Sequence, residues 1–484
     1  MLKTLRTCST QHAPQSPAQG ASSSVRSSAR RGWQHALGVF APVVVTLGCL
    51  KTPDRQAQST LDVTVNPPAN FELEGEPFCF AGSNNYYPIF KPKDVVDDLF
   101  ANAAKLDFKV MRVWAMLDVG ALDGSVPHVD PPGPKENVYL QYYDPGTQRV
   151  LHNEAENGLP RLDYVLDSAA RHGVKLILVM VNNWTAFGGI DQYIVWHGRQ
   201  YHHEFYTDPE IKQTYKSWLR AVVTRTNSLN GRLYRDDPTI FSWELANEPR
   251  AIAAGGRDSK SGWDKATITT WADEMSATIK SLDPNHMVSV GDEGFLDGGG
   301  SHWAYAANDG VDHKALTALE HIDFGTFHLY PEDWKATNQW GDQWIIDHLK
   351  VARELGKPTI LEEYGTKVTR AQGTLGAITH GWSERARTYQ RWNDIMLRRG
   401  GNGALVWMLA GKDNDGSRYP DYDGFAFWRD GPTGELLDGI AKSFETAPAC
   451  HAAGGTRPST SRFVKPRGRV ADEQAALEPG FWRL

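Results

Sequence analysis

From about residue 71 onward, short apolar runs of strand type alternate with longer amphipathic segments. Eight runs have strand character: residues 78–83, 109–114, 175–182, 240–246, 287–291, 324–328, 359–363 and 404–408. The segments of helix character between them include residues 95–105, 161–172, 209–227, 271–282, 343–355 and 384–399, and a short one at 315–319. Strands that alternate with helices predict parallel β/α units, and eight units predict an α/β fold of the (β/α)8 TIM barrel type with elaborated βα loops.

One connection is much longer than the others. Residues 117–160 lie between the second predicted strand and its helix, and they are rich in Pro, Gly, Asp and Tyr. Long loops of this kind usually serve function, so we expect this segment to lie near a binding cleft, where it could close one end.

Polar and aromatic residues gather where the predicted strands end. They are Asn84, Asn85, Tyr86 and Tyr87; Arg112 and Trp114; Asn182, Asn183 and Trp184; Asn247 and Glu248; Asp292 and Glu293; His328 and Tyr330; Glu363 and Tyr364; and Trp407. Any one of them could simply cap a strand or a loop. Because barrel enzymes place their chemistry at the carboxyl ends of the strands, the set as a whole indicates an active site.

Two of these residues are acids at the rim of the predicted sheet. Glu248 lies at the end of a strand-type run that Pro249 terminates, and Glu363 directly precedes Tyr364 and Gly365. Two carboxylates at the ends of two strands are what glycoside hydrolysis requires, since one must protonate the leaving oxygen while the other attacks the anomeric carbon or activates a water.

Two further acids lie close to this pair in the sequence. Glu244 lies four residues before Glu248 on the same strand, so it should share the facing of Glu248 but sit deeper. A buried carboxylate there needs a partner, and Arg112 is the candidate. Glu362 and Glu363 are adjacent, so alternation along a strand predicts that they point to opposite faces without saying which one faces the site.

Composition narrows the class of protein. A chain of 484 residues with 40% hydrophobic residues can form one large core. The net charge of -7 comes from 51 basic and 58 acidic residues without long runs, which gives no indication of binding to nucleic acid or to anionic membranes. Most of the 17 Trp are expected in the core, and a few are expected to stack on sugar rings.

The two ends of the chain do not follow the barrel pattern. Arg26, Arg30 and Arg31 precede an apolar run at residues 36–48 that has the length of a signal-peptide core and is short for a transmembrane span. We therefore expect a leader at 1–50, a linker at 51–69, a catalytic domain at 70–450, a C-terminal extension at 451–484, and a secreted or extracytoplasmic location. The segment ending in Gly48 and Cys49 also resembles a lipoprotein cleavage site, so lipid anchoring through Cys49 is the alternative.

Four cysteines are too few for a disulfide scaffold and lack metal-binding spacing, so no metal or other cofactor is expected. Cys79 lies in the first predicted strand and Cys450 follows the last predicted helix. Both positions fall on the N-terminal face of a barrel, which predicts a Cys79–Cys450 disulfide in an oxidising compartment. The alternative is two buried thiols.

The series of strand ends resembles glycoside hydrolase family five. The resemblance rests on Asn247-Glu248-Pro249, Arg112, His328-x-Tyr330, Glu363-Tyr364-Gly365 and Trp407, each on the matching strand. The runs Val181-Asn182-Asn183-Trp184, Phe187-Gly188-Gly189 and Gly291-Asp292-Glu293-Gly294, together with Arg250, are similar to the β-mannanase branch. The similarity covers roughly residues 70–448.

This resemblance implies a retaining site with Glu248 as acid/base and Glu363 as nucleophile, their carboxyl groups about 5 to 5.5 Å apart. Arg112 and Tyr330 should keep Glu363 ionised, and the neighbouring charge should keep Glu248 protonated. The substrate-binding residues that it implies are Arg112, Trp114, Asn183, Trp184, Asn247, His328, Tyr330 and Trp407. We expect a monomer whose partner is β-mannan or mannooligosaccharides.

Several alternatives remain open on the sequence. Endo cleavage of mannan, glucomannan or galactomannan is favoured over an exo-acting β-mannosidase of the same branch. A β-1,4-glucanase would use the same catalytic frame, but the run at 182–189 favours mannan. A non-catalytic carbohydrate-binding barrel would have lost a carboxylate, and both Glu248 and Glu363 are present.

Overall fold

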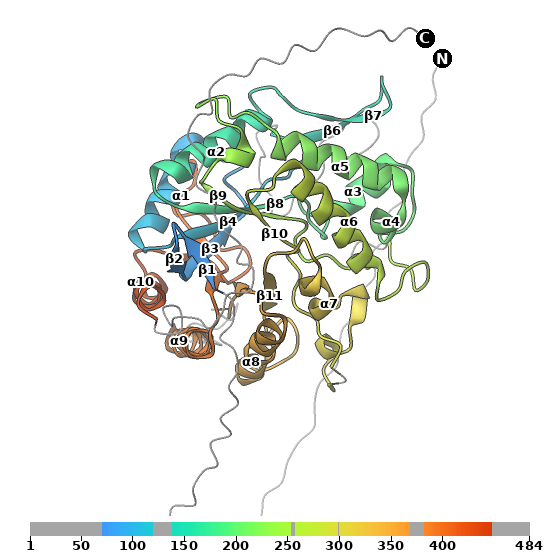
Figure 1. The fold of residues 1–484 in the computed structure, drawn as a ribbon. Coiled ribbons are helices and arrows are strands. Elements are labelled where there is room, and N and C mark those ends of the chain that lie inside the picture. Colours follow the sequence, from blue (N-terminus) through green and yellow to red (C-terminus); the bar gives the residue numbers. More distant parts are fainter. Residues whose placement is uncertain (1–69, 120–137, 253–256, 299, 368–381, 448–484) are drawn as a thin grey trace, which may run out of the picture. The chain divides into compact units, whose positions relative to one another are not determined.

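The computed structural model describes residues 70–119, 138–252, 257–298, 300–367 and 382–447 (Figure 1). The expected leader, linker and C-terminal extension lie outside these residues, as do Cys49 and Cys450.

Eight parallel strands form the centre of the fold, as the sequence predicted. They are β3 (Phe80–Asn85), β4 (Val110–Trp114), β8 (Lys175–Val179), β9 (Ile240–Glu244), β10 (Met287–Ser289), β11 (Gly325–Leu329), β12 (Thr359–Tyr364) and β13 (Gly403–Val406). Their order in the sheet is β10-β9-β8-β4-β3-β13-β12-β11. Backbone hydrogen bonds from Asp323 to Val288 (2.9 Å) and from His328 to Glu293 (3.1 Å) link β10 to β11. The sheet therefore closes into a (β/α)8 barrel.

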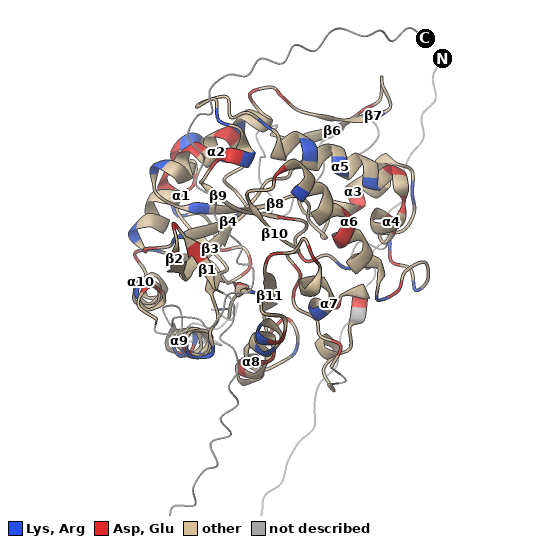
Figure 2. Cartoon of the chain, viewed as in Figure 1, with Lys and Arg blue, Asp and Glu red and all other residues tan. Residues whose placement is uncertain are grey.

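Helices cover the outside of this barrel (Figure 1). They are α1 (Lys93–Lys105), α2 (Leu159–Arg171), α3 (Gly189–Trp196), α4 (Glu204–Thr207), α5 (Pro209–Val223), α6 (Thr267–Leu282), α7 (His313–Ala318), α8 (Asn338–Leu355), α9 (Trp382–Arg399) and α10 (Pro432–Glu445), with 3-10 turns η1 (Tyr234–Asp236), η2 (Trp303–Tyr305) and η3 (Asn308–Gly310). Basic and acidic residues are interspersed along outer helices such as α1 and α5 (Figure 2), in keeping with the absence of charge runs in the sequence.

The sequence missed α3 because this helix has no polar face. Ile190, Tyr193, Ile194 and Trp196 are buried, and so are Asp191 and Gln192. An amphipathic pattern arises only where one face of a helix meets solvent, so a helix buried all round does not show it.

The lower end of the barrel is apolar. Each strand, or the residue just before it, contributes one side chain to a compact cluster: Phe80, Val110, Ile177, Phe241, Met287, Phe324, Ile360 and Leu405. The hairpin of β1 (Phe71–Leu73) and β2 (Glu76–Phe78) covers this end, and the Phe71 ring lies 5.1 Å from Phe241 and 5.3 Å from Phe324 between ring centroids. The polar residues of the barrel interior therefore lie toward its other end.

Part of the long excursion after β4 lies within the described residues. Its described residues form a three-stranded sheet of β5 (Asp118–Val119), β6 (Gln141–Asp144) and β7 (Arg149–His152). A smaller pair, β14 (Leu409–Ala410) and β15 (Phe427–Trp428), brackets the segment that follows β13. Within the described ranges, no helix has both the length and the apolar character needed to cross a bilayer.

Candidate active site

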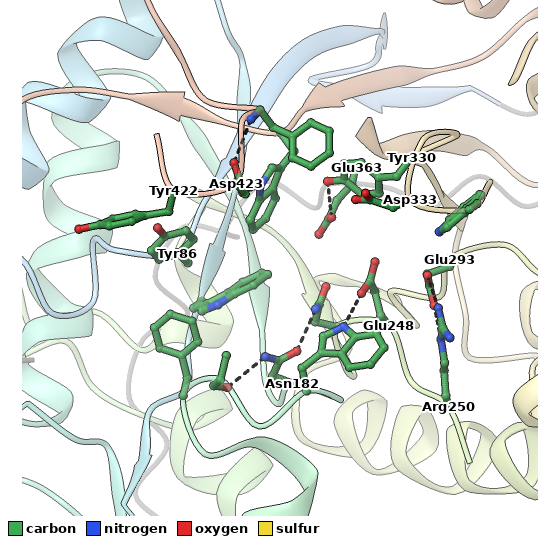
Figure 3. A pocket seen from close by; sticks show the side chains of 18 residues that line it. Tyr86, Asn182, Glu248, Arg250, Glu293, Tyr330, Asp333, Glu363, Tyr422 and Asp423 are labelled. Carbon is green, nitrogen blue, oxygen red and sulfur yellow. Dashed lines mark hydrogen bonds and ion pairs between the residues drawn. The ribbon is translucent and has the colours of Figure 1, made fainter. Parts of the chain in front are cut away.

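Glu248 and Glu363 project into one pocket at the carboxyl ends of the strands (Figure 3). One carboxylate oxygen of Glu248, one of Glu363 and a ring nitrogen of His328 all lie within 4.8 Å of one another. Retaining glycosidases keep their two carboxyl groups about 5 to 5.5 Å apart, whereas inverting enzymes need a wider gap for a water. The spacing fits direct attack by one carboxylate.

The backbone around Glu248 is unusual for a non-glycine residue. Glu248 has a φ of 50°, in the left-handed region, and its N–H donates to the carbonyl of Gly291 (2.8 Å). A side chain at Gly291 would collide with the Ala246 carbonyl and the Glu244 carboxylate, since an added Cβ would lie 2.1 and 2.2 Å from them. Strained backbone of this kind is typical of functional sites. Gly291 allows the close approach of the Ala246 carbonyl and the Glu244 carboxylate beside it.

The pocket has a volume of about 570 Å³ and extends to both sides of the two acids. Tyr86, Tyr422 and Asp423 lie at one end and Arg250 and Glu293 at the other, with Glu248 and Glu363 between them (Figure 3). The remaining lining residues are Trp114, Asn182, Trp184, Ala186, Phe187, Asn247, Tyr330, Asp333, Trp334, Trp407 and Phe425.

Arg112 lies beneath the pocket and is fully buried. Its Nε and Nη2 donate to both oxygens of Glu244 (2.8 and 2.6 Å), which confirms the expected pair. Nη2 also donates to Asn247 Oδ1 (2.7 Å), and Nη1 donates to Glu363. The planar guanidinium of Arg112 thus fixes both Glu363 and Asn247, the residue next to Glu248.

Glu363 has a second donor, because the Tyr330 hydroxyl bonds its Oε2 at 2.8 Å. Burial raises the pKa of Glu363, and the charge of Glu248 adds to this effect. His328, Arg112 and Tyr330 act in the opposite direction. Glu363 is therefore held in a desolvated position by two donors, Arg112 and Tyr330.

Glu248 differs from the expectation that it would itself hold the proton. Trp184 Nε1 donates to its Oε2 (2.5 Å), and His328 Nδ1 lies 2.8 Å from its Oε1. Burial favours the neutral acid, but His328, Arg250 and Trp184 outweigh it and lower the pKa of Glu248 to about 2. Burial likewise acts to lower the pKa of His328, yet Glu363, Glu248 and Glu362 raise it well above its usual range. These opposite shifts indicate that the proton of the His328–Glu248 pair lies on the imidazole.

Glu362 also points into the barrel, so the expectation that Glu362 and Glu363 face opposite sides is wrong. The pairing register of β12 shifts against β11 at Phe327/His328 and against β13 between Leu361 and Tyr364. Such a bulge turns two consecutive side chains to one face. Arg112 and His328 consequently contact both carboxylates.

The residues expected to bind substrate fall into two groups. Trp114, Trp184, Asn247, Tyr330 and Trp407 line the pocket, whereas Arg112, Asn183 and His328 do not. Arg112 contacts Glu363, and His328 contacts Glu248, from the side away from the pocket. Asn183 is fully buried, and its Oδ1 accepts from the Arg250 N–H (3.0 Å) and lies 2.9 Å from His202 Nε2. Its neighbour Asn182 lines the pocket instead, and it accepts from Asn247 Nδ2 at 2.9 Å.

At the end of the pocket near Glu248, Arg250 and Glu293 form a buried ion pair. Arg250 Nε and Nη2 donate to the Glu293 carboxylate at 2.6 and 2.7 Å. Burial and the charge of Glu248 raise the pKa of Glu293 to about 7, although Arg250 opposes them. Of the two acids after the fifth strand, Glu293 therefore reaches the pocket, while Asp292 is buried against His313 (2.9 Å).

At the other end, residues on the segment after β13 complete the pocket. Asp423 accepts a hydrogen bond from Trp407 Nε1 (2.8 Å), and Tyr422 is 50% exposed. The sequence analysis missed both residues because they lie on an irregular segment, where neither strand nor helix periodicity applies. The run rich in Asp and Tyr at residues 413–423, a few residues after the eighth strand, was the available signal.

Among the described residues, Glu248, His328 and Glu363 are the group close enough to share a metal ion. Their atoms already pair with one another, since His328 bonds Glu248 and Tyr330 bonds Glu363. We therefore interpret the three as an acid, its proton partner and a nucleophile.

Cys79 is buried and takes part in a disulfide. The other three cysteines lie outside the described residues, so the Cys79–Cys450 pairing stays a prediction.

Comparison with known sequences gives one consistent result. A family model described as GH family 5 beta-mannosidase-like matches residues 66–411. The probable mannan endo-1,4-beta-mannosidase F of Neosartorya fischeri is 40% identical over 302 residues, which is 61% of this chain and 60% of that protein. The probable mannan endo-1,4-beta-mannosidase C of Aspergillus terreus is 36% identical over 387 residues, 76% of this chain and 88% of that protein. This chain spans less than two thirds of the length of several F-type relatives, between 60% and 64%.

Solved structures show the same likeness. The endo-1,4-beta-mannanase from Rhizomucor miehei has 32% identity and a TM-score of 0.69, covering 78% of this chain and 98% of that one. The hyperthermostable endo-1,4-beta-D-mannanase from Thermotoga petrophila has 40% identity and a TM-score of 0.62, covering 76% and 100%. The chain therefore belongs to glycoside hydrolase family 5, in its beta-mannosidase-like group.

Proposed function

We propose that the protein is a retaining endo-1,4-β-mannosidase that cleaves mannan, glucomannan or galactomannan. The observation that supports this most strongly is the pair Glu248 and Glu363, whose carboxylate oxygens lie within 4.8 Å in the pocket of a family 5 chain. The curated relatives and solved structures described above carry mannan endo-1,4-beta-mannosidase or endo-mannanase names.

In the first step, Glu363 attacks the anomeric carbon of the mannosyl unit. Arg112 and Tyr330 fix its oxygens, so the carboxylate meets the sugar without reorienting. The His328–Glu248 pair supplies a proton to the glycosidic oxygen as the carbon–oxygen bond breaks. The products are a mannosyl ester on Glu363 and a shortened chain with a free hydroxyl.

The second step uses the charge change that the first one causes. Esterification removes the negative charge of Glu363, so Glu248 remains as a carboxylate beside the ester. It takes a proton from water while the water oxygen attacks the anomeric carbon from the side that the leaving group vacated. Two displacements restore the β configuration and release Glu363.

Trp407 and Asn247 recognise the mannosyl unit next to the glycosidic bond that is cleaved. Asp423 accepts from the Trp407 indole N–H and so fixes the angle of that ring, while the Trp114 ring lies 5.9 Å away between centroids. Asn247 Oδ1 accepts a hydrogen bond from Arg112, and one amide hydrogen of Asn247 is donated to Asn182. Its second amide hydrogen stays available for the 2-hydroxyl of mannose, which is axial and close to the reacting carbon.

Endo cleavage is supported by the shape of the pocket. Lining residues continue past the acids in both directions, from Tyr86 and Tyr422 to Arg250 and Glu293. The long excursion was a candidate to close one end, but its described residues do not line the pocket. An exo-acting β-mannosidase and a β-1,4-glucanase are the alternatives.

The experiment is a time course on linear mannan, galactomannan and carboxymethyl cellulose, with Glu363→Ala as the inactive control. We expect mixed mannooligosaccharides from the earliest times and no products from the cellulose derivative. Mannose as the sole early product would indicate an exo enzyme. Products from carboxymethyl cellulose alone would indicate a glucanase.

Export from the cytoplasm is part of the same proposal. It rests on the basic residues and the apolar run at 36–48, and on the size of a polysaccharide substrate that cannot enter a cell. Mass spectrometry of the mature N-terminus would distinguish free secretion from a lipid on Cys49.

A further inference from the structure

Glu362 is a fully buried carboxyl group to which the proposed chemistry gives no role. It lies on β12 directly before the nucleophile, and the bulge in that strand turns it toward the interior of the barrel. Its Oε2 lies 3.4 Å from His328 Nε2 and 3.7 Å from Arg112 Nε. Burying an ionisable group is costly, so its position calls for an explanation.

The other oxygen of Glu362 has no hydrogen-bond donor among the described residues. The Glu244 carboxyl is a close neighbour of Glu362. Burial and then the contact with Glu362 raise the pKa of Glu244 well above its usual range, although Arg112 opposes them. The Oε2 oxygen of Glu362 faces two cationic side chains, Arg112 and His328, so Glu362 lies as an acid beside the imidazole.

His328 thus lies between two carboxylates, with Glu248 on Nδ1 and Glu362 on Nε2. Glu363 is also close, at 3.7 Å from Nδ1, and Glu293 faces the pocket beyond Glu248. Arg112 is a buried cation that contacts these acids from below, and Arg250 lies beside Glu248 at the rim. The acids around His328 favour the protonated imidazole, and Glu362 is one of them.

We propose that Glu362 is a positioning residue for the reaction: it holds the imidazole of His328 from the side opposite Glu248, and its charge keeps the proton on the His328–Glu248 pair over the working pH range. This inference rests on the proposed glycosidase function. Glu362 itself does not touch the substrate, because it does not line the pocket.

The test compares the full-length wild type with Glu362→Gln, which keeps the shape and the acceptor but removes the charge. The basic limb of the kcat/KM pH profile on mannooligosaccharides reports loss of the proton from the free enzyme. We expect Glu362→Gln to move this limb to lower pH by about one unit, a tenfold change in proton retention. With 2,4-dinitrophenyl β-mannobioside, whose leaving group needs no proton, we expect less than about a threefold loss of rate.

Asp283→Asn is the matched control. Asp283 is a buried carboxylate 2.6 Å from the ring of His286, outside the residues that line the pocket. The control should leave the basic limb in place. Glu362→Asp retains the charge with a shorter reach, so it should keep the limb while lowering kcat, and it serves as the second variant if Glu362→Gln does not fold.

A readout without substrate separates this inference from the proposed function. The ring of 15N-labelled His328 should titrate at lower pH in Glu362→Gln than in the wild type. An unmoved basic limb together with an unchanged His328 titration would refute the role of Glu362. Lack of any wild-type turnover of β-mannosides would refute the proposed function, while the His328 titration would still decide the role of Glu362.

Discussion

At the scale of single residues, the floor of the pocket is a buried network of charged side chains, and Glu248 and Glu363 are the two acids of this network that face the pocket. Arg112 contacts Glu244, Glu362 and Glu363, and His328 contacts Glu248, Glu362 and Glu363. The sequence predicted that Glu248 and Glu363 lie together at the strand ends and that Arg112 pairs with Glu244, because spacing along a strand fixes depth and facing. The catalytic roles of the two acids stay a prediction. It did not predict that Glu362 joins the network, since a one-residue bulge cancels the alternation on which that prediction rested.

The first prediction concerns proton delivery. Glu248→Ala should lower kcat/KM on mannooligosaccharides by about 10²- to 10⁴-fold, the usual contribution of general acid catalysis. It should lower the glycosylation rate much less on 2,4-dinitrophenyl β-mannosides. Equal losses on both substrates in pre-steady-state assays would contradict the assignment of Glu248 as the acid.

The second prediction concerns Arg112. Replacing it with Met would leave Glu244 and Glu363 buried without their cation. Breaking a buried ion pair in this way costs about 3 to 5 kcal/mol of unfolding free energy. Urea unfolding should show this loss in Arg112→Met. Arg398→Met is the control, because the Arg398 side chain is 79% exposed and pairs only weakly with Asp394, and it should change stability by less than about 1 kcal/mol. A loss of similar size in both variants would contradict the role given to Arg112.

At the scale of elements, the loops that shape the pocket depend on neighbours far away in the sequence. Asp118 on β5 accepts from Gln141 on β6 (2.8 Å) and from the N–H of Gly189, and its own N–H donates to the Phe187 carbonyl (2.9 Å). Gly188 has a φ of +92°, and a Cβ there would lie 2.5 Å from the Asp118 carbonyl. The excursion thus supports the loop that carries Trp184 and Phe187. Sequence patterns could place this excursion near the site but could not show which contacts hold it.

The third prediction follows from the burial of Asp118. Burial raises its pKa to about 8, although the hydrogen bonds from Gln141 and Gly189 oppose the change. The unfolded chain releases this proton near its ordinary pKa of about 3.8, so between these values the folded state binds more protons and stability falls as pH rises. In Asp118→Asn, the decline of unfolding free energy between pH 5 and about pH 8 should be shallower than in the wild type. Identical pH dependence in the two proteins would contradict a protonated Asp118.

At the scale of the whole molecule, the barrel separates an apolar end from a chemically active one. Phe71 and the ring of strand residues around it form the first, and the Arg112 network forms the second. The eight strands were predictable as short apolar runs, because barrel strands are buried on both faces. Most of the helices were predictable as amphipathic segments, because one of their faces meets solvent. The fully buried α3 and the segment after β13 were not, because burial on all sides or irregular backbone leaves no periodic signal.

The fourth prediction concerns the disulfide of Cys79. In a (β/α)8 barrel the start of the first strand and the end of the last helix lie on the same face, so Cys450 is the expected partner. Non-reducing peptide mapping of the mature protein should recover a single linked peptide that contains both residues. Recovery of Cys79 linked to Cys49, or of Cys450 as a free thiol, would contradict it.

The central claim is that Glu248 and Glu363 act by double displacement on β-mannosidic bonds. The most direct test follows the anomeric proton signals of the first products by NMR during hydrolysis of mannohexaose. The β-anomer should appear first and then equilibrate slowly to the α-anomer, and Glu363→Ala should give no product. Initial appearance of the α-anomer would mean inversion, and it would contradict the mechanism that the 4.8 Å spacing of these groups supports.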